Sequence, residues 1–340
     1  MARPALIELP PPPEGATGWP WTTAPTALAD APDGGTEWPK ISIVTPSYNQ
    51  GDYLEQTIRS VLLQGYANLE YVIIDGGSTD ASVAIIRKYE PWLSYWVSAA
   101  DRGQSHAINK GFERCSGDLI TFQNSDDLYL PGAFADVGRQ WPALAGHGAI
   151  IGAFHYLDGA QIRPAPIPAR LPHPGPIDLA ITPSEAWRLH QVSAFYVGAA
   201  LDQVGRWVRE DLHYTMDREL LYRVCRAYPV RLSDRAYGAF RWHDEGKTVS
   251  HYLRADLEFS DLHLSYHYPT REQEAMKRKV ARQRRAKGYM RFARHQGVSG
   301  RSILALIRAA VYQPDLLRRV RYLKAWVRAL GLMRLRPGSG

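Results

Sequence analysis

The sequence predicts an α/β protein with a mostly parallel, doubly wound sheet and helices on both of its faces. Two observations predict this fold class. Short apolar runs alternate with helical patterns over residues 41–130, and the apolar runs end in polar or glycine residues. Ligands of such sheets bind beyond the carboxyl ends of the strands, so the polar segments after the strands form the candidate site.

The expected strands are short apolar runs rich in β-branched and aromatic residues, at 41–45, 71–74, 95–97 and 119–122. The expected helices carry apolar residues at three- and four-residue spacing or begin at a capping residue, and they are 54–64, 78–89 and 104–115. Residues 145–182 are rich in glycine and proline and are expected to be irregular with short strands. Residues 185–265 alternate between helical and strand-like stretches.

The composition is that of an ordinary globular protein, with 45% apolar and 22% charged residues in a chain of 340. No apolar run is long enough to cross a membrane, and the N-terminus does not resemble a secretory signal. Two cysteines are too few for a disulfide framework. We therefore expect a cytoplasmic protein.

Three regions differ in composition. Residues 1–39 contain nine prolines and are expected to form an extended or disordered arm. Residues 40–265 form the expected α/β domain, with a nucleotide-binding half at 40–135 and an acceptor or catalytic half at 136–265. Residues 266–340 form a basic amphipathic helical tail, because the net charge is +16 from Arg271 onward and −9 before it.

The tail pattern is typical of a helix that lies on an anionic membrane. Apolar residues recur at steps of four and three between basic ones, at Leu316, Val320, Leu323, Val327 and Leu330. We therefore expect peripheral contact with the inner face of the cell membrane. The alternative is a helix that packs on the domain or on a partner. Nucleic acid is not expected as a partner, because no recognised module accompanies the charge.

Three polar clusters follow strands and are expected to line one edge of the sheet: Thr45-Pro46-Ser47-Tyr48-Asn49, Asp75-Gly76-Gly77-Ser78-Thr79-Asp80 and Asn124-Ser125-Asp126-Asp127. The adjacent acids Asp126 and Asp127 repel each other unless a cation or hydrogen bonds offset their charge. Mg²⁺ and Mn²⁺ prefer such oxygen ligands together with phosphate oxygens. The alternative for each acidic cluster is a turn with a helix cap.

In this order and spacing the clusters resemble the family 2 glycosyltransferases, which are inverting enzymes of the GT-A fold. Asp101-Arg102-Gly103-Gln104, Ala107-Ile108-Asn109-Lys110-Gly111 and Gly117-Asp118 complete the match. The resemblance is close over residues 41–135 and weaker to about residue 250. It implies transfer of a single sugar from a nucleoside-diphosphate sugar, most often a UDP-sugar, to a hydroxyl of a glycan or lipid-linked acceptor.

The resemblance also implies the roles of individual residues. Asp75 corresponds to the acid that reads the nucleobase, and Asp126 to the ligand of Mn²⁺ or Mg²⁺, with His243 as a further metal ligand. The donor nucleotide would contact Thr45, Pro46, Ser47, Tyr48, Asp75, Gly76, Ser78, Gln104, Asn109, Lys110, Asn124, Ser125 and Asp126. His190, Gln191 and Asp127 are expected near the acceptor, and Asp127 is also expected to support Asp126. Asn124 stands where the family often has an aspartate, which removes one charge from the metal site.

An inverting transfer needs a general base that takes the proton of the acceptor hydroxyl. The resemblance places an aspartate at the start of a helix in the second half, and Asp217 fits. Glu219 and the pair Glu210 and Asp211 are the alternatives, and an aspartate at a helix start is also favoured by the helix dipole alone.

Other classes of function fit less well. A dehydrogenase of the Rossmann type would carry a Gly-x-Gly-x-x-Gly loop after the first strand, and a nucleotidyltransferase would carry a glycine-rich basic loop there. Residues 46–50 contain neither. A scaffold that keeps the fold without catalysis remains open, and Asn124 is the feature that favours it.

Overall fold

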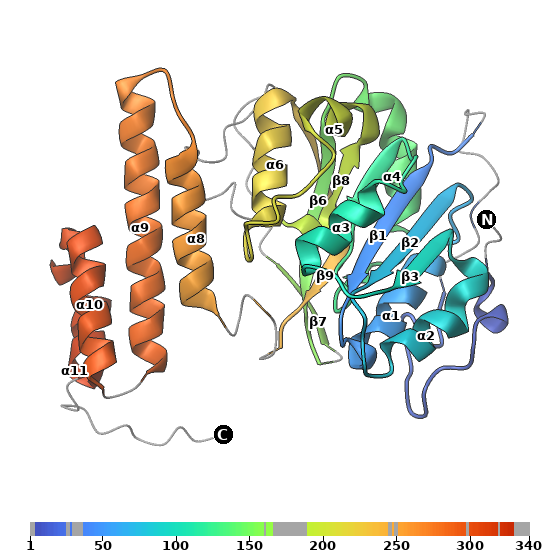
Figure 1. Ribbon diagram of the computed structural model, residues 1–340, viewed down its shortest axis with the longest axis horizontal. Coiled ribbons are helices and arrows are strands. Elements are labelled where there is room, and N and C mark those ends of the chain that lie inside the picture. Colours follow the sequence, from blue (N-terminus) through green and yellow to red (C-terminus); the bar gives the residue numbers. More distant parts are fainter. Residues whose placement is uncertain are drawn as a thin grey trace. The chain divides into compact units, whose positions relative to one another are not determined.

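The computed structural model describes residues 4–24, 28, 37–159, 161–165, 189–243, 247, 251–296, 299–318 and 320–329. It divides into two compact units, Met1–Asp211 with Met216–Trp242, and Leu212–Thr215 with His243–Gly340. The first unit is the α/β domain and the second is helical (Figure 1). Within the described residues no helix is both long and apolar enough to cross a bilayer.

In the described part of the chain nine strands form one sheet, in the order β3-β2-β1-β4-β8-β6-β9-β5 with β7 beside β6. The strands are β1 Ile41–Ser47, β2 Leu69–Asp75, β3 Tyr95–Ser98, β4 Leu119–Phe122, β5 Leu128–Tyr129, β6 Ala149–Asp158, β7 Gln161–Pro164, β8 Ala194–Val197 and β9 Val230–Arg241.

The four strands predicted from the sequence are present and parallel, since β1 pairs with β2 and β4, and β2 with β3. The other half of the sheet is mixed. Strand β8 is antiparallel to both β4 and β6, whereas β9 runs parallel to β6 and antiparallel to β5. The segment 145–182, expected to be irregular with short strands, contains the strands β6 and β7, and its residues beyond 165 lie outside the described residues.

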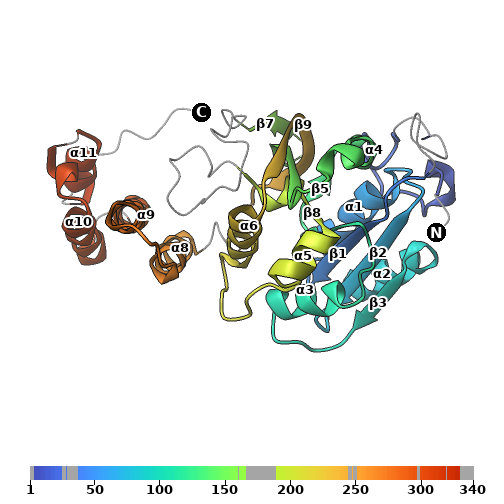
Figure 2. The ribbon, with the colours of Figure 1, turned by 90° about the horizontal axis from the view of Figure 1, so that it is seen from above.

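Helices cover both faces of the sheet, as predicted. They are α1 Gly51–Leu62, α2 Ser82–Tyr89, α3 Gln104–Phe112, α4 Ala133–Gln140, α5 Gly198–Val204 and α6 Met216–Ala227. Figure 2 shows α1 and α4 on one face and α3 and α5 on the other. Helix α3 lies close to β1 because Gly111 has no side chain, and a Cβ there would be 2.2 Å from Val44 Cγ1.

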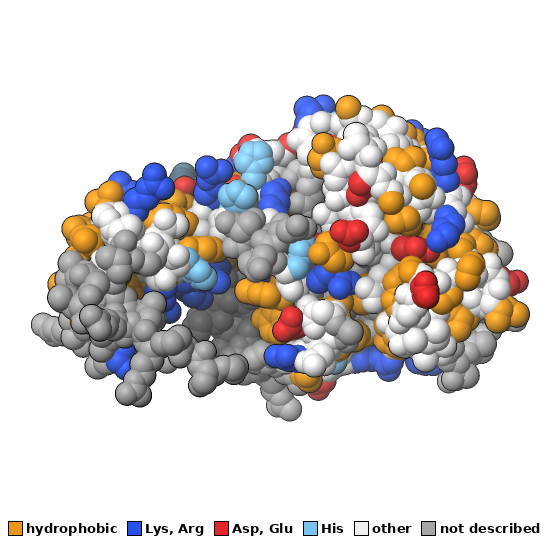
Figure 3. Space-filling view, turned by 90° about the horizontal axis from the view of Figure 1, so that it is seen from below, with side chains coloured by type: hydrophobic (Ala, Val, Ile, Leu, Met, Phe, Trp, Pro, Cys, Tyr) orange, Lys and Arg blue, Asp and Glu red, His pale blue; other side chains and the backbone are white. Residues whose placement is uncertain are grey.

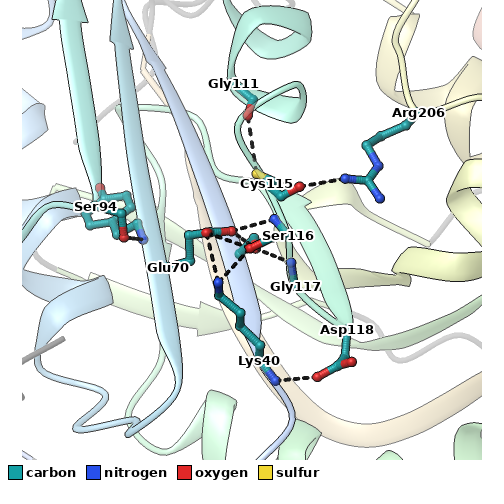
Figure 4. A network of polar contacts seen from close by, with 11 residues as sticks. Lys40, Glu70, Ser94, Gly111, Cys115, Ser116, Gly117, Asp118 and Arg206 are labelled. Atoms are coloured by element: carbon teal, nitrogen blue, oxygen red, sulfur yellow. Dashed lines mark hydrogen bonds and ion pairs between the residues drawn. The ribbon is translucent and has the colours of Figure 1, made fainter.

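A polar network ties together the beginnings of three strands (Figure 4). The Glu70 carboxylate accepts hydrogen bonds from Ser42 Oγ at 2.5 Å and Ser116 N at 2.7 Å, and Lys40 Nζ lies 3.0 Å away. Lys40 N also donates to Asp118 Oδ2 at 2.7 Å. The amino ends of β1, β2 and β4 are thereby held together, opposite the edge where the polar clusters lie.

Over residues 4–24 the proline-rich arm has little regular secondary structure and packs on the domain. The Arg59 side chain, which is 1% exposed, donates to the carbonyl oxygens of Pro10, Pro20 and Trp21 at 2.8, 3.0 and 3.1 Å. Trp19 Nε1 donates to Tyr129 O at 2.9 Å. Proline-rich backbone leaves its carbonyls free of internal hydrogen bonds, so the arm can supply the acceptors that a buried guanidinium needs.

The helical unit contains α8 Tyr252–Ser265, α9 Arg271–His295, α10 Gly300–Tyr312, the 3₁₀ turn Pro314–Arg318 and α11 Val320–Ala329. Helix α8, assigned by the sequence to the catalytic half, belongs to this unit and contacts α9 along its length. The division therefore falls at residues 242–243, earlier than the expected boundary at 265. The expected boundary rested on the change in net charge along the sequence. The observed one reflects packing, because Ala255, Phe259 and Leu262 of α8 are buried.

Helix α11 packs into a core of its own unit. Tyr322, Ala325 and Ala329 are buried there with Leu316, Leu306 and Ala309. Of the apolar residues predicted to face a membrane, Leu316 is therefore a core residue and Val327 is half-buried. The side chains of Val320, Leu323 and Leu330 lie outside the described residues.

Candidate functional site

Three strand ends meet at one edge of the sheet in register. Ser47 pairs with Asp75, and Asp75 pairs with Ser98 across the parallel strands β1, β2 and β3. In β4 the neighbour of Val44 is Phe122, so residues 123–127 emerge at the same edge. The prediction that the three polar clusters share one edge is confirmed.

The Asp75 carboxylate is fully buried and surrounded by donors. Oδ2 accepts from Gly77 N at 3.1 Å, Ser78 N at 2.8 Å and Ser98 Oγ at 2.6 Å, and Oδ1 accepts from Ser78 Oγ at 2.5 Å. Two of these donors are rotatable hydroxyls, so a ligand donor can replace one without a change in the backbone. Gly77 takes a φ of 83°, which a residue without Cβ adopts at little cost.

The first two loops are bonded to each other. Asn49, at a φ of 50°, donates from its backbone to Ser78 Oγ at 2.8 Å and accepts from Thr79 N at 2.9 Å through its side chain. Asp80 Oδ2 accepts from Gly51 N at 2.8 Å at the start of α1. Tyr48, the residue before Asn49, is 61% exposed. The result is a fixed double loop with one aromatic side chain projecting from it.

Thr45 and Ser47, predicted to touch the nucleotide, are buried. Thr45 Oγ1 lies 3.1 Å from the Tyr71 hydroxyl, and both side chains are inaccessible. Pro46, between Thr45 and Ser47, is also buried in β1, whereas Gly76 and Ser78 lie in the loop after β2 and are half-buried.

The turn after β4 is ordered by side-chain amides. Gln104 Nε2, at the start of α3, donates to Asn124 Oδ1 at 2.9 Å, and Asn124 Nδ2 donates to Asp127 Oδ2 at 3.2 Å. Two residues predicted to bind the donor are thus in contact with each other. Ser125 is buried, and its carbonyl accepts from Thr57 Oγ1 at 2.8 Å.

Arg241 holds the same turn from β9. Its backbone N donates to Asp127 Oδ1 at 2.9 Å, and its Nε donates to Asp126 O at 2.7 Å. Its Nη2 donates to Gln56 Oε1 at 2.6 Å, and the guanidinium lies 4.9 Å from the Tyr53 ring centre. The acidic turn is therefore fixed by a buried arginine from a strand more than a hundred residues later in the chain.

The two adjacent acids differ in environment. Burial, and then the neighbouring Asp126, raise the pKa of Asp127 well above that of an ordinary aspartate, although Arg241 and Asn124 lower it. Asp127 is 1% exposed, and both of its carboxylate oxygens accept hydrogen bonds within the protein, from Asn124 and Arg241. Asp126 is half-buried and is the member of the pair that faces outward.

The side chains at this edge suit a metal ion that is held mainly by the phosphates of the bound substrate. Among the described residues no three His, Cys, Asp or Glu side chains form a cluster that could hold a metal ion. One outward carboxylate, Asp126, is a site of the kind that Mg²⁺ or Mn²⁺ occupies when phosphate oxygens and waters complete its shell. His243, the other predicted ligand, is half-buried at the start of the second unit.

Asp217 lies in the first turn of α6 and is half-buried. Its neighbour Arg218 donates to the carbonyl of Leu189, and Gln191 Nε2 donates to the carbonyl of Phe122 at the end of β4. The start of α6 is thereby linked to the edge where the polar clusters lie. Burial, and then the Asp217 carboxylate, raise the pKa of the Tyr196 hydroxyl in β8.

The alternative bases are all bound to arginine. Arg102 contacts Glu210 through two nitrogens at 3.0 and 3.1 Å. Burial raises the pKa of Glu210, but the hydrogen bonds from Arg102 and Asn109 outweigh it, so the net pKa is lowered. The other pairs are Arg209 with Asp211 at 2.5 Å and Arg223 with Glu219 at 3.0 Å.

Asn109 and His190, which were predicted to contact the donor and the acceptor, contact other residues of the protein. Asn109 Nδ2 donates to Val208 O and its Oδ1 accepts from Val208 N, at 2.9 and 2.7 Å, while Lys110 beside it is half-buried. The His190 ring lies between Phe154 and Phe240, with centroids 4.7 and 4.9 Å apart. Burial, followed by the charge of Arg218, lowers the pKa of His190 to about 3, so the ring is neutral at physiological pH.

Sequence reasoning missed Ser98 and Arg241. Ser98 could have been predicted from the sequence, because it ends a strand as Ser47 and Asp75 do. Nothing in the sequence pointed to Arg241, since its partners are brought together only by the pairing of β9 with β5 and β6.

Comparisons with known proteins agree with this geometry. The model of "Glycosyl transferase family 2" matches residues 42–159. An uncharacterized glycosyltransferase of Mycobacterium tuberculosis is 41% identical over 114 residues, which are 33% of this chain and 42% of that protein. The chain thus spans about two-fifths of the length of that relative.

Two solved structures share the fold. TarS 1–349 of S. aureus in complex with UDP-GlcNAc has a TM-score of 0.58 at 17% identity, over 86% of this chain and 88% of that one. The mannosyltransferase PcManGT of Pyrobaculum calidifontis, in complex with GDP-Man and Mn²⁺, has a TM-score of 0.54 at 16% identity, over 93% and 91%. Residues 42–159 therefore belong to glycosyl transferase family 2, within a domain of the GT-A fold.

Proposed function

We propose that this chain transfers a single sugar from a nucleoside-diphosphate sugar to a hydroxyl of a glycan or lipid-linked acceptor, with inversion at the anomeric carbon. The observation that carries the proposal is the row of Ser47, Asp75 and Ser98 at one sheet edge, with Asp126 emerging beside it. Similar structures hold UDP-GlcNAc and GDP-Man. UDP is the first nucleotide to test.

The donor would lie along this edge. Asp75 accepts a hydrogen bond from the base in place of a serine hydroxyl, and Tyr48, which is exposed, covers the nucleotide. Asp126 would hold Mn²⁺ or Mg²⁺ together with the diphosphate. When bound, the ion offsets the negative charge that develops on the leaving diphosphate.

Asp217 is the proposed general base. It takes the proton of the acceptor hydroxyl as that oxygen forms a bond to the anomeric carbon. The bond from that carbon to the phosphate oxygen breaks, and the diphosphate leaves with the electron pair. The support is the position of Asp217 in the first turn of α6, whose start is linked to the strand edge through Leu189 and Gln191.

The test combines turnover with nucleotide binding. In Asp217→Asn we expect turnover to fall by about 10²–10⁴, because general base catalysis contributes about that much. UDP with Mn²⁺ should still raise the melting temperature as in the unchanged protein, since the ligand binds the folded state. Asp211→Asn is the matched control and should keep both properties.

Two results would contradict parts of the proposal. Full turnover in Asp217→Asn would remove this residue as the base. If UDP, dTDP, GDP and CMP with Mn²⁺ all left the melting temperature of the folded protein unchanged, the scaffold hypothesis would replace the transferase.

A further inference from the structure

Helix α10 has one buried side and one apolar side that is open to solvent. Ser302, Ala305, Leu306 and Ala309 are buried in the helical unit. Leu304, Ile307 and Val311 are 48%, 47% and 71% exposed. Leu317, in the 3₁₀ turn that follows, is 56% exposed. Contiguous exposed apolar side chains of this size usually mark an interaction surface.

Two arginines share the open side. A helix advances about 100° per residue, so Arg301, Leu304, Ile307, Arg308 and Val311 fall within an arc of roughly 120°. Both arginines are exposed, and the Arg308 guanidinium lies 5.7 Å from the Tyr289 ring centre of α9. We name these five residues the α10 face. It is apolar along one border and cationic along the other.

The segment of the sequence that contains the α10 face is strongly cationic. The sequence from Met276 to Pro314 contains eleven Lys and Arg and no Asp or Glu. Arg278, Lys279, Arg282 and Arg294 of α9 are exposed. In the helical unit, at the left of Figure 3, the described side chains in view are mainly apolar and basic.

Charge crowding in α9 is visible at Lys287. Burial, and then the charges of Arg284 and Arg291, lower the pKa of Lys287, although Asp256 raises it. Asp256 is itself shared, since Arg284 Nε lies 2.7 Å and Arg291 Nη1 3.7 Å from its carboxylate.

We propose that the α10 face binds the surface of an anionic phospholipid bilayer. The apolar residues enter the boundary between headgroups and acyl chains, and Arg301 and Arg308 contact the phosphates. The positive charge and the apolar side chains of the α10 face together favour a bilayer over a second copy of the chain or a polyanion. A second copy of the face would bring cations against cations, and a polyanion without an apolar phase would leave Leu304, Ile307 and Val311 in water. The proposal is independent of the sugar transfer proposed above.

Flotation of the full chain with vesicles tests the proposal. With vesicles of phosphatidylcholine containing 30% phosphatidylglycerol we expect the protein to float, and with phosphatidylcholine alone to stay at the bottom. The triple variant Leu304→Ser, Ile307→Ser, Val311→Ser should bind at least tenfold less. Arg301→Gln with Arg308→Gln should bind less, and its binding should depend less steeply on salt than that of the unchanged protein.

Matched controls separate the α10 face from a general surface effect. Ile162→Ser removes an apolar side chain of similar exposure in β7, and Arg139→Gln removes an exposed arginine of α4. Neither should change flotation. Circular dichroism and gel filtration establish that each variant is folded.

Three results would overturn the proposal. The first is flotation that the triple variant retains in full. The second is a dimer of the unchanged chain that the triple variant converts to a monomer, without vesicle binding by either. The third is binding to RNA or heparin in the absence of any binding to anionic vesicles.

Discussion

Asp126 and Asp127 are neighbours in the chain, yet their carboxylates meet different surroundings. Asp127 is buried beneath Arg241 and Asn124, and its pKa is raised by burial and then by Asp126. The turn therefore presents the charge of Asp126 outward, which suits a metal ion that is completed by the phosphates of a substrate.

Glu70 shows the opposite behaviour at the other edge of the sheet. Burial raises the pKa of Glu70, but the hydrogen bonds from Ser42, Ser116 and Lys40 together lower it by more. The net pKa therefore lies below the ordinary 4.5. The ionised form is thus favoured by folding. Its contribution to stability is complete above about pH 4.5 and is lost as the pH falls through the lowered pKa.

For Glu70→Gln we therefore expect a pH-dependent loss of stability. At pH 7 the free energy of unfolding should fall by about 1–3 kcal/mol, because a charged acceptor of several hydrogen bonds is removed. The difference from the unchanged protein should shrink as the pH drops below about 4.5. Urea unfolding at both pH values measures this. Glu113→Gln, at an exposed position, is the control, and a deficit independent of pH would contradict the assignment.

At the scale of elements, the arm of residues 4–24 is held by the buried Arg59 of α1. The arginine reaches three carbonyls of the arm and the Tyr89 hydroxyl at 3.1 Å, and its guanidinium lies 5.4 Å from the Trp21 ring centre. A buried guanidinium without acceptors is costly, so the arm and α1 stabilise each other.

Arg59→Met should release the arm. We expect a loss of about 2–4 kcal/mol in the free energy of unfolding, because three carbonyls of the arm lose a charged donor. Limited proteolysis should then cleave within residues 4–24 while the rest of the domain resists. Arg87→Met, an exposed arginine of α2, serves as the control and should behave like the unchanged protein. Continued resistance of the arm in Arg59→Met would show that other contacts hold it.

At the scale of the whole molecule, the two units have separate hydrophobic cores. One contains Ile41, Ile43 and Tyr71 of the sheet, and the other contains Leu306, Ala309 and Tyr322. Each unit can therefore be weakened without a direct loss of packing in the other.

Leu306→Ala tests this independence. Leu306 is fully buried, so its truncation should cost about 2–5 kcal/mol in the helical unit. Hydrogen exchange should rise in α9, α10 and α11 and stay unchanged in β1, β2 and β4. Leu304→Ala, two residues away and exposed, should change stability by less than about 0.5 kcal/mol. Faster exchange in both units of Leu306→Ala would mean that they unfold together.

The sequence by itself determined the parallel half of the sheet and the place of the candidate site. Residues 41–122 alternate between strands and helices, and parallel strands bring their carboxyl ends to one edge, so Asp75 and Asp126 had to emerge there. The ordered motifs also determined the family of residues 42–159.

Only the tertiary structure decided what surrounds these residues. The antiparallel β8, the docking of the arm on Arg59, the assignment of α8 to the helical unit and the burial of Asp127 beneath Arg241 all depend on contacts between distant segments. The periodicity of a single segment shows which of its sides is apolar. It does not show which distant segment will cover that side, because that depends on the packing of the whole chain.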